Sequence, residues 1–122
     1  MYELTVESHF DAAHSIEGYS GECARVHGHT WKVALTVRAE SVDELGMSID
    51  FKRLKGILEE AVRRFDHRVL NELEEFAGTN PTAENIARVL YGILAERLRG
   101  GDVSVSSLTI SEGEGNVLTY RP

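Results

Sequence analysis

Apolar and polar residues alternate near both ends of the chain and follow a helical period in its middle. The alternation begins at Tyr2 and runs to His14, and it returns from roughly Gly28 to Glu40. Because successive side chains of a strand point to opposite faces, a period of two predicts strands with one buried face. The C-terminal part predicts two more strands, Val103–Glu112 and Asn116–Arg121, joined by a glycine-rich turn.

The middle of the chain predicts two amphipathic helices. Asp50 can cap a helix that begins at Phe51 and carries an apolar stripe at a spacing of 3.6 residues. The second helix has two candidate caps, Asn80 and Thr82, and ends at the Gly100-Gly101 pair. The apolar stripes are Phe51, Leu54, Ile57, Leu58, Ala61, Val62 and Phe65 in the first helix, and Ile86, Ala87, Leu90, Ile93, Leu94 and Leu98 in the second.

These elements predict an α+β fold in the order β-β-α-α-β-β. Two helices are expected to cover one face of a four-stranded antiparallel sheet. The 122 residues fit one domain that spans positions 1–122. An open sheet of this kind exposes two edges, which natural proteins pair, cover or blunt, so we expect oligomerisation through these edges.

Composition and charge narrow the classes of function. Hydrophobic residues make up 42% of the chain and charged residues 27%, as in globular proteins. The net charge of -7 disfavours a nucleic-acid partner, because binding to phosphates depends on clustered Lys and Arg. No apolar run is long enough to span a membrane, and the N-terminal segment lacks the pattern of a signal peptide. The single cysteine cannot form an intramolecular disulfide, so we expect a cytoplasmic protein.

The strongest candidate for chemistry is the pair His27 and His29, which opens the second predicted strand. Two residues that are two apart on a strand point to the same face, so both imidazoles can reach one ion, zinc first among them. A catalytic zinc site needs a third protein ligand, and the choices are His9, His14 and His67. His14 is favoured because it ends the strand that should pair with the one carrying His27 and His29.

Cys23 precedes this histidine pair in a polar loop, where burial in a core is not expected. Beside a metal and an imidazole its thiolate would be favoured, which suits a general base. It could equally be a fourth metal ligand that closes the site. The spacing in the sequence does not decide between the two roles.

Two other acidic positions each have a functional and a structural interpretation. Asp66 and His67 follow one another at the end of the first helix, where they could serve only as solvated capping residues. As a pair, the carboxylate would orient the imidazole and make it a better proton carrier. Glu112 is either an exposed turn residue or a carboxylate that accepts two parallel N–H bonds from a guanidine-like edge.

Taken together, these residues resemble the 6-pyruvoyl-tetrahydropterin synthase family, and most closely its bacterial 6-carboxy-tetrahydropterin synthases of 7-deazapurine (queuosine) biosynthesis. The resemblance extends from Phe10 to Tyr120. It departs from the family pattern at Asp11, where serine is frequent. The motifs that carry it are Phe10-Asp11-Ala12-Ala13-His14, Cys23-x-x-x-His27-Gly28-His29, Ile49-Asp50-Phe51, Asp66-His67-x-x-Leu70-Asn71, Pro81-Thr82-Ala83-Glu84-Asn85-Ile86-Ala87 and Glu112.

The resemblance implies the tunnelling fold, in which trimers close a barrel, two trimers stack, and active sites form at subunit interfaces. It implies a homo-hexamer and a role for each candidate residue. Zinc would be bound by His14, His27 and His29. Cys23 would be the general base, Asp66 and His67 the second proton-transfer pair, Glu112 the anchor of the pterin amidine edge, and Thr82 a nearby contact to the ring.

The reaction that the resemblance implies takes 7,8-dihydroneopterin triphosphate to 6-carboxy-5,6,7,8-tetrahydropterin, acetaldehyde and triphosphate. One alternative within the family eliminates triphosphate and stops at 6-pyruvoyl-tetrahydropterin. An alternative from another class is a non-catalytic zinc-binding or assembly module, with Cys23 as the fourth ligand.

Overall fold

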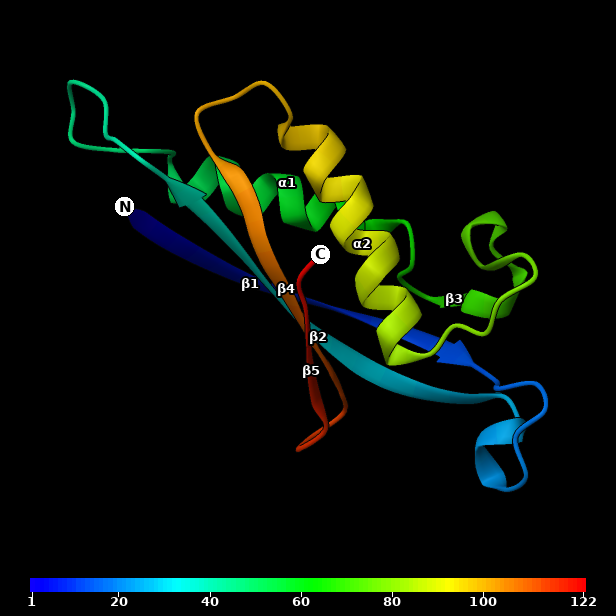
Figure 1. Ribbon diagram of the computed structural model, residues 1–122. Coiled ribbons are helices and arrows are strands. Elements are labelled where there is room, and N and C mark those ends of the chain that lie inside the picture. Colours follow the sequence, from blue (N-terminus) through cyan, green and yellow to red (C-terminus); the bar gives the residue numbers. More distant parts are fainter.

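The computed structural model describes residues 1–122 and contains two helices packed on a twisted sheet (Figure 1). The four long strands and both helices appear where the sequence pattern predicts them. The elements in chain order are β1 (Tyr2–His14), β2 (His27–Ala39), α1 (Phe51–Arg63), β3 (Arg68–Val69), α2 (Ala83–Leu98), β4 (Ser104–Glu112) and β5 (Val117–Tyr120), with short 3-10 turns at Glu22–Ala24, Leu70–Glu72 and Glu74–Phe76.

The sheet has the strand order β3-β1-β2-β4-β5. β1 and β2 form a long antiparallel hairpin that stays in register from the Tyr2–Ala39 pair to the His14–His27 pair. β3 was not predicted from the sequence, and it adds a fifth strand that pairs in parallel with β1 at Ala12 and Ala13. A strand of two residues is too short to show an alternating pattern, so its pairing depends on the chain around it.

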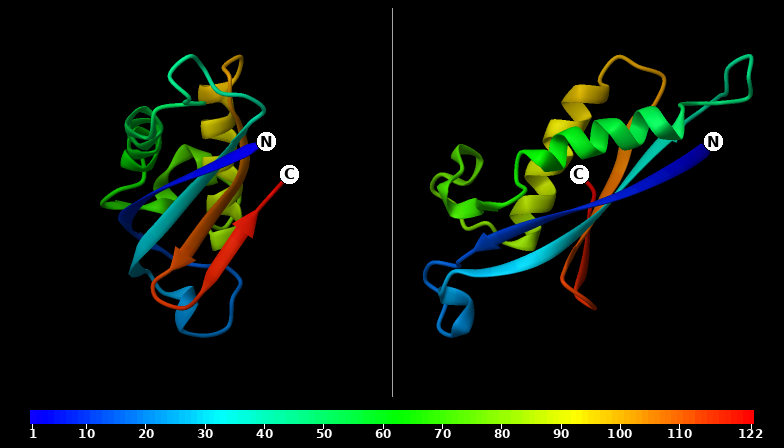
Figure 2. Two further views of the ribbon diagram at one scale, coloured as in Figure 1. Left: turned by 90° about the vertical axis from the view of Figure 1, so that its left-hand side faces the viewer. Right: turned by 180° about the vertical axis from the view of Figure 1, so that it is seen from behind.

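Both helices cover the same face of the sheet, as two further views show (Figure 2). The residues of β2 that face them are buried, from Trp31 to Ala39 at every second position. The predicted stripe of α1 is buried except at its first residue, since Phe51 is 57% exposed. Phe65 lies beyond the end of the helix, yet its side chain is fully buried in the core.

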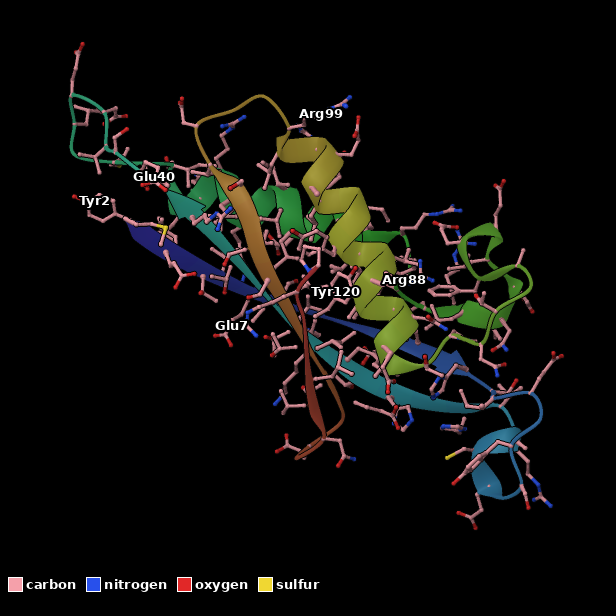
Figure 3. All side chains as sticks on the ribbon, viewed as in Figure 1. Tyr2, Glu7, Glu40, Arg88, Arg99 and Tyr120 are labelled. Atoms are coloured by element: carbon pink, nitrogen blue, oxygen red, sulfur yellow. The ribbon has the colours of Figure 1, made fainter.

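The helix caps and the C-terminal strand are fixed by specific contacts. The carboxylate of Asp50 accepts a hydrogen bond from the backbone N–H of Lys52 at 2.8 Å and caps α1. Of the two candidate caps of α2, the structure selects Thr82, whose hydroxyl accepts from the backbone N–H of Asn85 at 3.1 Å. Tyr120 of β5 lies against α2 (Figure 3), where its ring meets Tyr91 edge to face with centroids 5.3 Å apart.

Neither helix has the length and apolar character needed to cross a membrane.

Candidate active site

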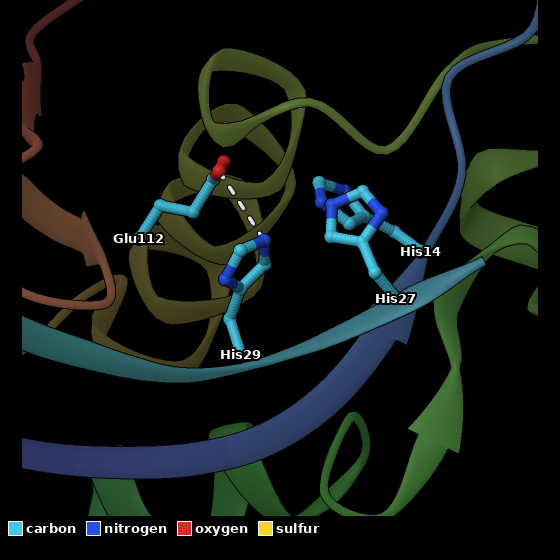
Figure 4. A group of neighbouring side chains, drawn as sticks. All are labelled: His14, His27, His29 and Glu112. Atoms are coloured by element: carbon cyan, nitrogen blue, oxygen red, sulfur yellow. Dashed lines mark ion pairs between the residues drawn. The ribbon is translucent and has the colours of Figure 1, made fainter. Parts of the chain in front are cut away.

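Three histidines meet where β1 ends and β2 begins (Figure 4). His14 lies directly opposite His27 in the register of the hairpin, and His29 follows on the same face of β2. The ring centroids of His14 and His27 are 4.6 Å apart, those of His27 and His29 4.8 Å, and those of His14 and His29 5.3 Å. The alternation of side chains along the two strands therefore gathers the three imidazoles into one cluster.

Backbone carbonyls fix the tautomers of two of these rings. Nδ1 of His14 lies 2.7 Å from the carbonyl oxygen of Pro81, and Nδ1 of His27 lies 2.7 Å from that of Arg25. A carbonyl oxygen can only accept, so each Nδ1 carries the proton and donates it. In a neutral ring this leaves the lone pair on Nε2, which is how ligating histidines are commonly oriented.

The cluster contains polar atoms without partners. Nε2 of His14 and Nε2 of His29 are buried and make no hydrogen bond within the protein. A buried polar atom without a partner costs free energy, so such atoms are rare unless they serve a ligand. Imidazole nitrogens that converge in this way match the donor set of a divalent transition metal such as zinc. The residues present therefore fit a metal site.

Glu112, at the end of β4, joins the histidines. The register of β2 and β4 pairs Glu112 with Trp31, two residues beyond His29. Its Oε1 lies 3.3 Å from Nε2 of His29, although not in hydrogen-bonding geometry. The ligand atoms of the four residues all lie within 4.8 Å of one another. Burial lowers the pKa of His29 and outweighs the opposing effect of the Glu112 carboxylate, which favours the neutral ring that can act as a ligand.

Trp31 forms the floor of the cluster, a role that the sequence analysis missed. Its side chain is fully buried, and its ring centroid lies 5.0 Å from that of His14 and 5.3 Å from that of His29. The indole N–H donates to the carbonyl oxygen of Ala12 at 3.2 Å and fixes the ring across the hairpin. The available signal was its parity, because Trp31 continues the series of His27 and His29 along one face.

Cys23 lies outside the group of atoms that could ligate a metal. It belongs to the exposed 3-10 turn before β2 and is not among the four residues whose ligand atoms lie within 4.8 Å of one another. It nevertheless lines a cavity of about 230 Å³ together with His14, Thr82 and Glu112. Cys23 thus shares this cavity with His14 without joining the histidine cluster. Tyr19 and Glu84 also line this cavity, and the sequence analysis did not single them out.

Asp66 and His67 form a second cluster, with Asp11. Nδ1 of His67 lies 2.8 Å from Oδ2 of Asp66, and the other carboxylate oxygen accepts the backbone N–H of Asp11 at 2.9 Å. The hydrogen bond from Asp11 and the contact with His67 lower the pKa of Asp66, while Asp66 raises the pKa of His67. The pair does not line the cavity beside the histidines of the same chain. His67 lines another cavity, of about 530 Å³, together with His29. The predicted contact within the pair is therefore present, outside the cavity that Cys23 and Glu112 line.

The sequence matches the family profile described as 6-pyruvoyl tetrahydropterin synthase over residues 3–122. A protein of Archaeoglobus fulgidus, provisionally named 6-carboxy-5,6,7,8-tetrahydropterin synthase, is 39% identical over 111 residues, which cover 91% of this chain and 88% of the relative. The Bacillus subtilis 6-carboxy-5,6,7,8-tetrahydropterin synthase is 37% identical over 95 residues, covering 74% of this chain and 63% of its own length. The dihydroneopterin monophosphate aldolase of Pyrococcus furiosus is 37% identical over 107 residues, covering 85% and 83%.

The fold leads to the same group of proteins. The 6-pyruvoyl tetrahydropterin synthase of Caenorhabditis elegans superposes with a TM-score of 0.84 at 30% sequence identity, covering 100% of this chain and 97% of the worm chain. The profile match spans nearly every residue, and the superposition includes the two helices and the mainly antiparallel sheet. The chain belongs to the 6-pyruvoyl tetrahydropterin synthase family of pterin-converting enzymes.

Proposed function

We propose that the protein converts 7,8-dihydroneopterin triphosphate and one water to 6-carboxy-5,6,7,8-tetrahydropterin, with release of acetaldehyde and triphosphate. The observation that carries this proposal is the histidine cluster with two unpartnered buried nitrogens, beside a cavity that also contains a thiol. The identity of 39% and 37% to two proteins named for this activity supports the choice of product.

His14, His27 and His29 would hold a zinc ion, each through one imidazole nitrogen. Bound there, zinc would supply Lewis acidity toward the hydroxyl groups of the substrate side chain. The hydrogen bonds from Nδ1 of His14 and His27 to backbone carbonyls keep those two rings in the ligating orientation before any metal arrives. With three protein ligands, such an ion would keep a coordination position for the substrate, as catalytic sites require.

In this proposal the substrate occupies the cavity that Cys23 lines, and Cys23 acts as the general base on one face of it. His67 is the second proton carrier, and Asp66 orients it through the 2.8 Å contact between their side chains. The raised pKa of His67 supports this role, because the imidazole keeps a proton to donate closer to neutral pH. Cys23 and His67 would thus move protons on opposite faces of the substrate during cleavage of the carbon–carbon bond.

Glu112 would bind the amidine edge of the pterin, and Thr82 would contact the ring. A carboxylate can accept two parallel N–H bonds from such an edge. Glu112 is partly buried at 29% side-chain exposure, and it lines the same cavity as Thr82. Both residues end or begin a regular element, which gives the substrate two rigid contacts.

The active form would be a homo-hexamer of two trimers. β3 pairs only with Ala12 and Ala13, so the outer edge of β1 before them has no strand partner in the chain, and β5 leaves the other edge of the sheet open. Pairing between these edges in neighbouring copies would satisfy both. It would also allow Asp66 and His67 of one copy to approach the cavity of another.

One assay tests the reaction directly. Zinc-loaded protein is incubated with 7,8-dihydroneopterin triphosphate, the pterin product is identified by mass, and acetaldehyde is measured enzymatically. We expect a carboxy-pterin and one acetaldehyde for each pterin consumed. A 6-pyruvoyl product without acetaldehyde would overturn the proposal and assign the activity by which the worm enzyme is named.

A second candidate activity is the cleavage of dihydroneopterin monophosphate by an aldolase reaction. The 37% identity to the Pyrococcus furiosus aldolase over 85% of this chain favours it specifically. The same assay with the monophosphate as substrate separates the candidates. Turnover of the monophosphate with none of the triphosphate would select the aldolase.

A further inference from the structure

Two asparagine side chains each bind both backbone groups of one residue in the segment that follows β1. Oδ1 of Asn71 accepts the N–H of Ser15 at 2.9 Å, and its Nδ2 donates to the carbonyl of Ser15 at 2.9 Å. Asn80 binds Glu17 in the same way, at 2.9 Å and 3.0 Å. Each amide thus reproduces the pair of hydrogen bonds that a neighbouring strand would make.

These two contacts lie at the base of the loop that carries Cys23. Between the two bound residues, the N–H of Ile16 donates to the carbonyl oxygen of Cys23 at 2.9 Å. Residues 17–26 are all exposed, so the loop buries no side chain that could hold it by packing. Its position therefore depends on hydrogen bonds, which are these at the start of the loop and the one from Nδ1 of His27 to the carbonyl oxygen of Arg25 at its end.

The segment that contains Asn80, just before α2, also orients a histidine of the cluster. The carbonyl of Asn80 accepts from Nδ2 of Asn85 in the first turn of α2 at 2.8 Å. The next carbonyl along the chain, that of the buried Pro81, accepts from Nδ1 of His14 at 2.7 Å. Asn80 and Pro81 thus connect the cysteine loop, the start of α2 and a ring of the histidine cluster within two residues.

We propose that Asn71 and Asn80 are positioning residues that hold the Cys23 loop at a fixed place relative to His14. The inference rests on the proposed function for its effect on turnover, and on the hydrogen bonds alone for its effect on the loop. A loop of this exposure would otherwise sample many conformations, and ordering it in advance removes that cost from the reaction. Neither asparagine touches the substrate in this proposal.

The test uses the metal-loaded protein and the variants Asn71→Leu and Asn80→Leu, which keep the size of the side chain and remove its hydrogen bonds. Thr5→Val, which removes the hydroxyl that pairs with Thr36 far along β1, is the matched control. We expect amide hydrogen exchange to accelerate about tenfold at Ser15 in Asn71→Leu and at Glu17 in Asn80→Leu, because each variant removes the acceptor of that N–H. Exchange at Ile16 should accelerate as well, although neither asparagine contacts that amide.

Turnover supplies the second measurement. We expect kcat to fall by about 10–100-fold with little change in KM or zinc content, because a displaced thiol affects the reaction more than binding. Asn71→Asp keeps the acceptor for the N–H of Ser15 but not the donor for its carbonyl, so it should recover part of kcat. Thr5→Val should match the wild-type protein in every measurement.

Unchanged exchange at Ile16 in both leucine variants would overturn the proposal, and so would accelerated exchange with an unchanged kcat. Failure of the proposed function is distinguishable from either. A wild-type protein that does not turn over the pterin triphosphate rejects that function, while exchange at Ile16 still decides whether the asparagines hold Cys23 in place.

Discussion

At the scale of single residues, the main feature is the separation of the atoms that could ligate a metal from the thiol. Three imidazoles and Glu112 converge, two of the rings are already oriented by backbone carbonyls, and Cys23 lies in the adjoining cavity without joining them. A thiolate bound to zinc would be a ligand, whereas one beside the site remains available for proton transfer. Removing the thiol would therefore release zinc if the sulfur is a ligand, and would leave zinc bound if it is not.

Cys23→Ala should keep one zinc per chain and lose nearly all turnover. The three histidines do not depend on the sulfur for their positions, so metal binding persists, while the base is absent. Zinc content is measured by atomic absorption and turnover by product formation. His27→Ala is the contrasting variant, which should lose the metal as well. Loss of zinc from Cys23→Ala would instead identify the sulfur as a ligand.

Glu112→Gln should weaken pterin binding by about 1.5–3 kcal/mol, the range for hydrogen bonds to a charged group. The variant keeps the size of the side chain but replaces one acceptor oxygen by a donor. Binding of a non-reacting pterin by calorimetry measures the loss, with Glu114→Gln as the control, since Glu114 is 92% exposed in the next turn. Unchanged pterin affinity would remove Glu112 from the substrate site, and a simultaneous loss of zinc would make it a metal ligand.

Asp66→Asn should lower the pKa of His67 toward its ordinary value of 6.5. In the folded protein Asp66 raises that pKa, so the stability from the imidazolium is complete below pH 6.5 and is lost as the pH rises through the raised value. The pKa of Asp66 is lowered, so its contribution is present above its ordinary value of 3.8 and is lost as the pH falls through the lowered one. The pair therefore stabilises the fold most between pH 3.8 and 6.5.

The measurement is an NMR titration of the His67 ring in the wild-type protein and in Asp66→Asn. An unchanged midpoint for His67 in the variant would show that the carboxylate does not hold the imidazolium.

At the scale of elements, the β1–β2 hairpin and the cap of α2 bring the site residues together. The hairpin register places His14 against His27, and the cap of α2 places Thr82 at the cavity. Asp50 performs the same capping function for α1, yet it lies outside every group of residues assigned to the site. The cap of α1 therefore has a structural role alone, whereas the cap of α2 also lines the cavity.

Asp50→Ala should destabilise the protein by about 1 kcal/mol, the usual loss for an N-terminal cap, without changing zinc content or kcat. The backbone N–H of Lys52 loses its acceptor, while the sheet and the cavity are untouched. Urea unfolding measures the stability, and Glu59→Ala on the exposed face of the same helix is the control. A loss of activity at unchanged stability would contradict this assignment.

The sequence predicts those parts of the site that local alternation forms, and it does not predict those that depend on contacts between residues far apart in the chain. The His27–His29 parity and the pairing of His14 with this strand follow from local alternation, and the structure shows both. The approach of Glu112 to His29 depends on the register of β2 with β4, which shifts between Thr36 and Val37 and has no local signal. The separate position of Asp66 follows from its hydrogen bond to Asp11, 55 residues earlier in the chain.

At the scale of the whole molecule, the sheet is open on both edges, and the face away from the helices carries polar and charged side chains. Along this face lies a cavity of about 670 Å³ that Lys32, Lys55 and His9 help to line. Val117 of β5 and Tyr2 of β1, at the two open edges, are 66% and 51% exposed. Apolar side chains and unpaired backbone groups at the same edges favour pairing with further copies of the chain.

Sedimentation analysis should therefore give a species of six times the 13.6 kDa chain. Activity should fall when dilution dissociates it, because Asp66 and His67 would then be separated from the cavity of the neighbouring copy. Zinc content should not fall with it, since all three histidines belong to one chain. A fully active monomer would exclude a shared site.

His67 has a φ of 58°, and it is the only residue other than glycine with a positive φ. An ordinary side chain in this left-handed region costs roughly 1–2 kcal/mol, which glycine would avoid. The protein therefore tolerates a locally unfavourable backbone to present an imidazole that is 79% exposed and adds nothing to the core. Glycine at this position would relax the backbone, but it would remove the imidazole that we propose as a proton carrier, together with its contact to Asp66.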